Sequence, residues 1–135
     1  MHDLIASQLA SQDDASALDE WKLAVEDTAK AEQFAPNDAE NAYNLGTSRL
    51  KLAQFEEGRF DKDRLEQLKQ AIGDFTRAIE KNAYHAAAWA NRGQANYLLD
   101  RWEPALRDFE RAVELKPGVK AKVTIQMEEC RRKVK

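Results

Sequence analysis

The sequence predicts an all-α fold of antiparallel helix pairs with a capping helix at its C-terminal end, and three observations indicate it. Small residues stand at Gly93, Ala105 and Ala112, where two antiparallel helices can approach closely, and Trp89, Trp102 and Phe109 are expected to fill the space around them. The same residue types recur upstream at Gly46, Ala71, Phe75 and Ala78. The chain of 135 residues is 33% charged with only five Gly and three Pro, a composition typical of long solvated helices.

The stretch from 86 to 117 resembles the tetratricopeptide repeat (TPR), a helix–turn–helix module of about 34 residues. The residues that carry the resemblance are Trp89, Gly93, Ala105, Phe109, Ala112 and Pro117. Pro117 ends the second helix because it has no amide hydrogen and its ring clashes with the preceding turn. The resemblance implies a right-handed helical solenoid that binds other proteins and does no chemistry itself. We expect residues 1–135 to form a single TPR domain.

Residues 1–38 are expected to form a degenerate first repeat. Ala24, Ala31 and Pro36 have the same spacing as Ala105, Ala112 and Pro117. The segment from Trp21 to Phe34 is therefore predicted to be the second helix of this repeat, opened by a capping-box-like pattern at Ser16 and Asp19. Residues 1–15 do not match a first helix.

Residues 39–85 are expected to form a repeat with a lengthened helical hairpin. The interval from Gly46 to Ala71 is 13 residues longer than that from Gly93 to Ala105. Asp38 is predicted to start the first helix, which runs to about residue 57, and Gly58 allows the reversal. At 3.6 residues per turn, the insertion lengthens both helices by about two turns each. The expected packing at the tip is Leu52 and Phe55 against Leu65 and Leu68, with Phe60 near the turn and Asp61 capping the second helix.

Residues 86–118 are expected to form a regular repeat with helices near 86–99 and 101–116. Asp100 and Glu103 are interpreted as a capping pair, and Pro104 is tolerated in the first turn. Residues 119–135 are the predicted capping helix, with Val123 and Met127 on its apolar face. Repeat arrays need such a terminal helix with a polar outer surface.

No catalytic, cofactor or metal site is expected. The histidines, His2 and His85, are isolated, the glycines form no phosphate-binding loop, and no cluster has metal-ligand spacing. The net charge of −3 argues against nucleic-acid binding. Residues 1–40 carry a net charge of −8 and residues 86–135 a net charge of +4, so the chain has an acidic beginning and a basic end. The sequence therefore predicts a protein that is not an enzyme.

The single cysteine, Cys130, permits no intramolecular disulfide and is expected to be an inert structural thiol. This cysteine usage fits a reducing compartment, which is cytoplasmic or faces the cytosol. No apolar run approaches the length of a membrane span.

The resemblance to TPR proteins implies a concave groove, lined by the first helix of each repeat, that holds a peptide or a partner helix. By matching position, the predicted groove residues are Tyr43, Asn44, Thr47, Leu50, Lys51, Ala90, Asn91, Gln94, Tyr97 and Leu98. Asn44 and Asn91 recur at the same point of both repeats, and the family often uses this asparagine to hold a ligand backbone. The alternative for Leu50 and Tyr97 is packing against the following helix, and Tyr84 is expected to fill a gap between repeats.

One TPR subfamily binds the acidic C-terminus of heat-shock chaperones through a carboxylate clamp of Lys, Arg and Asn side chains. With Asn91 as the central asparagine, the clamp positions are Tyr43, Thr47, Ala121 and Ile125. With Asn44 as the central one, the later pair falls on Ala87 and Asn91. Neither register supplies the cations, so a terminal carboxylate would lose its charge-assisted bonds. Carboxylate-clamp chaperone binding is therefore not expected.

A looser likeness is to the plant mitochondrial import receptor with TPR-like repeats, which binds amphipathic presequence helices. It is carried by residues 36–41, Gly46 and the Leu52–Phe55 segment before the lengthened hairpin. The expected function is a non-catalytic adaptor that binds a partner peptide or helix in the groove. The alternatives are an organelle-import receptor domain and a scaffold module that self-associates through the projecting hairpin, and the sequence leaves monomer or dimer open.

Overall fold

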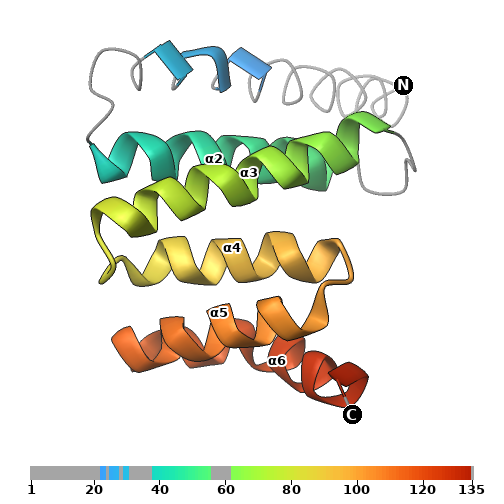
Figure 1. Cartoon of the computed structure of the whole chain (residues 1–135). Coiled ribbons are helices and arrows are strands. Elements are labelled where there is room, and N and C mark those ends of the chain that lie inside the picture. Colours follow the sequence, from blue (N-terminus) through green and yellow to red (C-terminus); the bar gives the residue numbers. More distant parts are fainter. Residues whose placement is uncertain (1–21, 24, 28, 31–37, 56–61, 135) are drawn as a thin grey trace, which may run out of the picture.

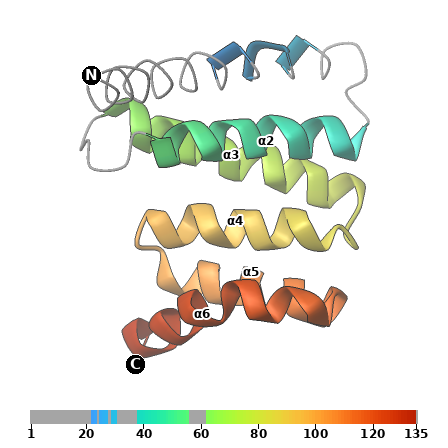
Figure 2. The same cartoon turned by 180° about the vertical axis from the view of Figure 1, so that it is seen from behind.

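The chain folds into a stack of antiparallel helices (Figures 1 and 2). The computed structural model describes residues 22–23, 25–27, 29–30, 38–55 and 62–134, which include helices and no β-strand. The helices are α2 (Ala39–Phe55), α3 (Lys62–Lys81), α4 (Ala86–Leu98), α5 (Trp102–Leu115) and α6 (Lys120–Val134), with a short 3-10 turn η1 (Pro117–Val119) before α6. Each helix packs against the next one along the chain. The predicted all-α fold of antiparallel pairs is confirmed.

Several sequence predictions fall on residues outside those described. The seven described positions between 22 and 30 are helical, but most of the predicted first repeat lies outside. The same holds for the predicted turn at Gly58 and for Phe60 and Asp61. On either side of that turn, α2 has 17 residues and α3 has 20, against 13 in α4 and 14 in α5. The hairpin is therefore longer by about one turn in α2 and nearly two in α3, at 3.6 residues per turn.

Each helix pair closes on a contact between a glycine and a phenylalanine ring. A Cβ atom built on Gly93 would lie 2.9 Å from the Phe109 ring, and one built on Gly46 would lie 2.8 Å from the Phe75 ring. Both distances are shorter than a real carbon–carbon contact, so only glycine lets the helices approach this closely. The recurrence of the Gly–Phe pair thus sets the same helix separation in both hairpins.

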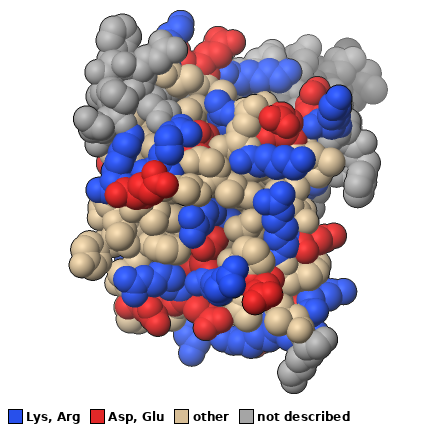
Figure 3. Space-filling model, viewed as in Figure 1, with Lys and Arg blue, Asp and Glu red and all other residues tan. Residues whose placement is uncertain are grey.

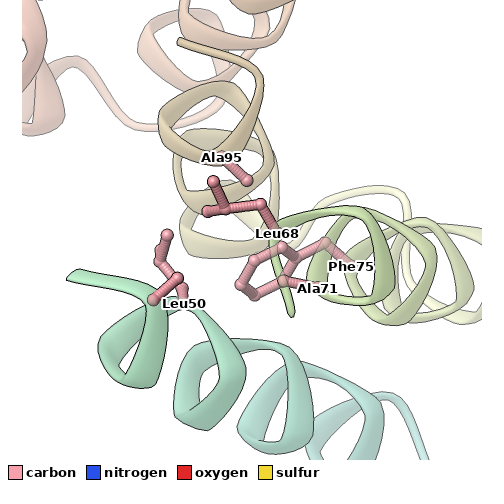
Figure 4. Close-up of a cluster of buried hydrophobic side chains, with 6 residues drawn as sticks. Leu50, Leu68, Ala71, Phe75 and Ala95 are labelled. Atoms are coloured by element: carbon pink, nitrogen blue, oxygen red, sulfur yellow. The ribbon is translucent and has the colours of Figure 1, made fainter. Parts of the chain in front are cut away.

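Within the described residues, the apolar core consists of three clusters, and each is built from consecutive helices. In the first, Leu50 of α2, Leu68, Ala71 and Phe75 of α3, and Ala95 of α4 converge (Figure 4). The second joins Ala42 of α2, Ala78 and Ile79 of α3, and Ala88 of α4. The third joins Ala105 and Phe109 of α5 with Val123, Met127 and Cys130 of α6. Helix α6 therefore covers the last apolar face of the stack, as predicted for a capping helix.

The helix ends follow the predicted capping at Asp38 and differ from it at Asp100, and His85 supplies a cap for which there was no prediction. Asp38 caps α2, since its Oδ1 accepts a hydrogen bond of 2.9 Å from the Glu40 amide. His85 caps α4, and its Nδ1 accepts from the Ala88 amide at 3.2 Å. Asp100 does not cap α5: it has a φ of 59° in the left-handed turn region, and Arg101 is the N-cap residue. A short polar side chain such as Asp tolerates that conformation better than most residues.

Two aromatic residues differ from their predicted places. Trp89 lies half-buried at the junction between α3 and α4, where its indole N–H donates to the Ala83 carbonyl at 2.9 Å. It therefore borders the core of the last hairpin instead of filling it. Tyr84 does not fill a gap between repeats, because its side chain is 78% exposed. Among the described residues, no helix is both long enough and apolar enough to traverse a bilayer.

Candidate functional site

The site begins with a groove between helices that are not neighbours in sequence. Helices α2, α4 and α6 contact one another along one side of the stack, α2 with α4 and α4 with α6. They enclose a groove of about 380 Å³. Its lining residues are Tyr43, Thr47, Leu50, Lys51, Gln54, Ala90, Asn91, Gln94, Phe109, Val119, Lys122 and Val123.

Helical periodicity explains why these residues share one wall. On α2 the lining side chains recur at intervals of three or four residues from Tyr43 to Gln54, so they lie on one face of the helix. On α4 the lining residues Ala90, Asn91 and Gln94 have the same spacing. Because α2 and α4 pack against each other in the stack, these faces of the two helices both border the groove.

Tyr43 is fixed by contacts on two sides. Its ring lies 6.0 Å from the Phe75 ring and 4.5 Å from the His85 ring, measured between centroids. His85 is held in turn, because its Nε2 lies 2.7 Å from Glu40 Oε1 while its Nδ1 caps α4. The ring at the base of the groove is therefore oriented before any ligand arrives.

Asn91 links two walls of the groove. Its Nδ2 donates to the Tyr43 hydroxyl at 3.3 Å and to Thr47 Oγ1 at 3.4 Å. Both distances are at or beyond the long end for N–H···O bonds, so these bonds are weak. An amide held in this way is positioned between α2 and α4 and can exchange its partners for a backbone carbonyl of a ligand.

The structure brings together seven of the ten residues predicted for the groove, namely Tyr43, Thr47, Leu50, Lys51, Ala90, Asn91 and Gln94. Leu50 also belongs to the buried core. Asn44 is exposed, Tyr97 is half-buried and Leu98 packs against the first core cluster, and none of the three lines the groove. The packing alternative holds for Tyr97, since it packs against the α5–α6 cluster and forms an edge-to-face contact with Trp102 at 5.5 Å.

Tyr97 binds α6 directly, because its hydroxyl donates a short hydrogen bond to Glu129 Oε2. The bond to this carboxylate, together with burial, raises the pKa of Tyr97 from 10.0 to about 12. The neutral phenol is thus the form that the folded state prefers. The stability that it contributes is present below pH 10 and is lost as the pH rises from 10 to about 12.

We expect the Tyr97→Phe variant to lack one phenolate transition at the alkaline end of a spectrophotometric titration. The reason is that Glu129 holds the proton on this phenol until the pH approaches 12. Absorbance of the phenolate, followed in wild type and variant, measures the transition. A lost transition centred near pH 10, the ordinary value for tyrosine, would contradict the assigned bond.

The sequence did not identify the third wall of the groove. Val119, Lys122 and Val123 come from η1 and α6, and Gln54 extends the α2 wall by a further turn. A signal for Gln54 was present, since it follows Lys51 by three residues on the same helical face. For α6 the repeat spacing is misleading, because it matches Asn91 and Gln94 with Ile125 and Glu128, which do not line the groove.

The opposite side of the stack, where α3 and α5 lie in front, is densely charged with both signs interspersed (Figure 3). Beneath it each hairpin buries an aspartate next to its core phenylalanine. Asp108 accepts from Arg92, with Nη2–Oδ1 at 2.7 Å and Nε–Oδ2 at 3.0 Å, and from Asn96 Nδ2 at 3.1 Å. Asp74 lies 3.1 Å from Arg49 and 2.6 Å from Arg77. The Asp-Phe pair recurs 34 residues apart, a signal that sequence reasoning missed.

No cluster of three or more metal-ligating side chains occurs within the described part of the chain. Cys130 is fully buried in the α5–α6 cluster, and burial raises the pKa of its thiol. A buried thiol with a raised pKa is a poor nucleophile. The groove lining itself offers the aromatic rings of Tyr43 and Phe109, amide and hydroxyl groups, and two ammonium groups.

Comparisons with known proteins agree with this architecture. Residues 86–119 match the family model of the tetratricopeptide repeat. The fold is similar to the Arabidopsis OM64 TPR domain with a TM-score of 0.70 and 23% identity, covering 94% of this chain and 95% of that one.

Two curated proteins share sequence with shorter parts of the chain. The peroxisomal targeting signal receptor of Yarrowia lipolytica is 36% identical over 52 residues, which is 38% of this chain. Serine/threonine-protein phosphatase 5 of Rattus norvegicus is 41% identical over 66 residues, or 48% of this chain. The chain spans 9% and 13% of the length of these relatives. Residues 86–119 are therefore a tetratricopeptide repeat, in a chain with the fold of a TPR domain.

Proposed function

We propose that this chain is a non-catalytic interaction module that binds a peptide segment of a partner protein in the groove between α2, α4 and α6. One observation carries the proposal: side chains of α2, α4 and α6, together with Phe109 of α5 and Val119 of η1, line a single groove of about 380 Å³. Recognition of an extended segment needs apolar contact area and polar groups that pair with its backbone. Tyr43 supplies the first, and Asn91 and Gln94 supply the second.

The order of the site before binding supports the proposal further. Tyr43 is oriented by Phe75 and His85, and Asn91 is positioned by its bonds to Tyr43 and Thr47. A binding surface that is already ordered loses less conformational entropy when the ligand arrives. The likeness to TPR-containing relatives agrees with an interaction module of this kind.

We expect the double variant Asn91→Ala, Gln94→Ala to bind groove peptides at least about tenfold more weakly than wild type, because two amide partners of the ligand backbone are lost. The peptides come from selection of a random displayed library on the wild-type protein, and affinity is measured by titration calorimetry. Tyr97 is left intact, because its bond to Glu129 supports α6.

The matched control is Gln70→Ala, an exposed amide on α3 outside the groove, which should leave the affinity unchanged. Circular dichroism should give the same helical signal for all three proteins. Unchanged affinity in the double variant, with an intact helical signal, would place the binding surface elsewhere.

The two alternative functions gain no support from the groove. Presequence helices are basic, whereas the charged side chains in the groove lining are Lys51 and Lys122. Self-association was expected through the tip of the lengthened hairpin, which lies outside the described residues.

A further inference from the structure

We propose that the occupant of the groove is a peptide segment rich in aspartate and glutamate side chains. This inference rests on the proposed function and names the chemistry of its ligand. It begins with the charge of the lining: of its twelve residues only Lys51 and Lys122 are charged, and both are cations. The groove is thus locally positive in a chain whose net charge is −3.

The two lysines stand on the outer walls of the groove. Lys51 belongs to α2 and Lys122 to α6, with α4 between them. A segment that crosses from α2 to α6 therefore meets an ammonium group near each wall and the Asn91 amide in the middle. An acidic side chain at each end of such a segment can form an ion pair with one of these ammonium groups. Basic side chains at the same places would be repelled by them.

Neither lysine has an acidic neighbour on its own helix. The positions three and four residues away from Lys51 are Thr47, Ser48, Gln54 and Phe55, and those around Lys122 are Gly118, Val119, Ile125 and Gln126. Ion pairs within a helix form between residues three or four positions apart. Because none of these positions holds Asp or Glu, neither lysine can pair with a carboxylate there.

Three arginines elsewhere in the described chain, in contrast, are paired with carboxylates. Arg111 lies 2.8 Å from Glu114, Arg107 lies 3.6 Å from Glu103, and Arg92 is bound by Asp108. The described residues include no ion pair of Lys51 or Lys122, although both are exposed. The groove therefore presents two cations whose carboxylate partners are supplied by the ligand.

The positions of the lysines favour acidic side chains over a free C-terminus. A carboxylate clamp would place its groups at Tyr43, Thr47, Ala121 and Ile125, and neither lysine occupies those positions. The lysines instead stand on separate walls, where they suit two carboxylates spaced along a segment. Each solvent-exposed pair contributes about two- to fivefold in affinity, so the preference arises from both lysines together.

The test is a selection of random displayed peptides whose C-termini are fused to the carrier, which removes every free terminal carboxylate. We expect the peptides retained by the wild type to be enriched in Asp and Glu. The variant Lys51→Glu, Lys122→Glu should bind them roughly tenfold more weakly. Raising the salt concentration should weaken wild-type binding and should affect the variant much less.

The matched control is Lys69→Glu, Lys116→Glu, which changes the net charge by the same amount at exposed positions outside the groove. We expect it to retain wild-type affinity within about twofold, since distant surface charges are screened. Synthetic peptides with a free or an amidated C-terminus then separate capture of a terminus from recognition of side chains.

The outcomes distinguish this inference from the function on which it rests. If groove peptides carry no acidic enrichment, or bind the Lys51→Glu, Lys122→Glu variant as tightly as wild type, the acidic preference is wrong and groove binding stands. If only peptides with a free C-terminus bind, the groove recognises a terminal carboxylate and the proposed preference for acidic side chains is wrong. If no peptide is retained, or if all bind the Asn91→Ala, Gln94→Ala variant equally, the proposed function itself fails.

Discussion

Replacing Phe109 with alanine is expected to lower the free energy of unfolding by about 3–5 kcal/mol. The ring is fully buried between α4 and α6, where it packs against Gly93 and joins the cluster with Val123, Met127 and Cys130. Truncation removes this apolar contact and leaves a cavity that the glycine cannot fill. Typical domains have a total stability of only about 5–15 kcal/mol, so the variant should be close to unfolding.

Urea denaturation followed by circular dichroism measures this loss. Trp89→Ala serves as the comparison and should cost less, because Trp89 is only half-buried at the junction. A Phe109→Ala protein that unfolds at the wild-type urea concentration would contradict the Gly93–Phe109 contact. If the two variants lose the same free energy of unfolding, Trp89 contributes to the core of the hairpin as much as Phe109 does.

Replacing Arg92 with methionine is expected to lower the free energy of unfolding by about 2–4 kcal/mol, somewhat below the 3–5 kcal/mol typical of a fully buried pair. The change removes two of the three hydrogen bonds to Asp108 and leaves a buried carboxylate with only Asn96. The expected loss is smaller than for a fully buried pair because the Arg92 side chain is 19% exposed and therefore partly solvated. Its contact with the Trp89 ring, at 4.8 Å, is lost as well.

A double-mutant cycle tests the cause of this loss. Asp108→Asn removes the buried charge, so adding it to Arg92→Met should recover part of the stability. Thermal or chemical unfolding of the four proteins gives the coupling energy. Simple additivity of the two single changes would show that packing of the arginine, rather than its charge pairing, accounts for the effect.

The fold was predictable because the residues that form its main contacts recur at matching positions of the two repeats. Gly46 with Phe75 and Gly93 with Phe109 lie at matching positions, and each pair forces two helices together. The ends of the helices were harder to predict, because capping depends on local backbone geometry. His85 caps α4 although histidine is not a usual N-cap residue, and Asp100, which is one, adopts a left-handed turn instead.

The candidate site was predictable on two walls and not on the third. Repeat matching placed Tyr43 and Asn91 together because corresponding helices face the same way. It did not point to Lys122, because the 34-residue spacing matches Lys122 with Ala88, which does not line the groove. It also could not separate Tyr97 from the groove, because a partner one helix further on, Glu129, decides where that side chain points.

The three-helix composition of two of the core clusters has a consequence for how the chain can be divided. The clusters around Leu68 and Ala78 are completed by Ala95 and Ala88, which belong to the following repeat. A fragment cut between residues 85 and 86 would keep a whole sequence repeat yet leave its apolar surface open to water. The smallest cooperative folding unit is therefore longer than the repeat by one helix, and domain-swapped or truncated versions must be spliced within that limit.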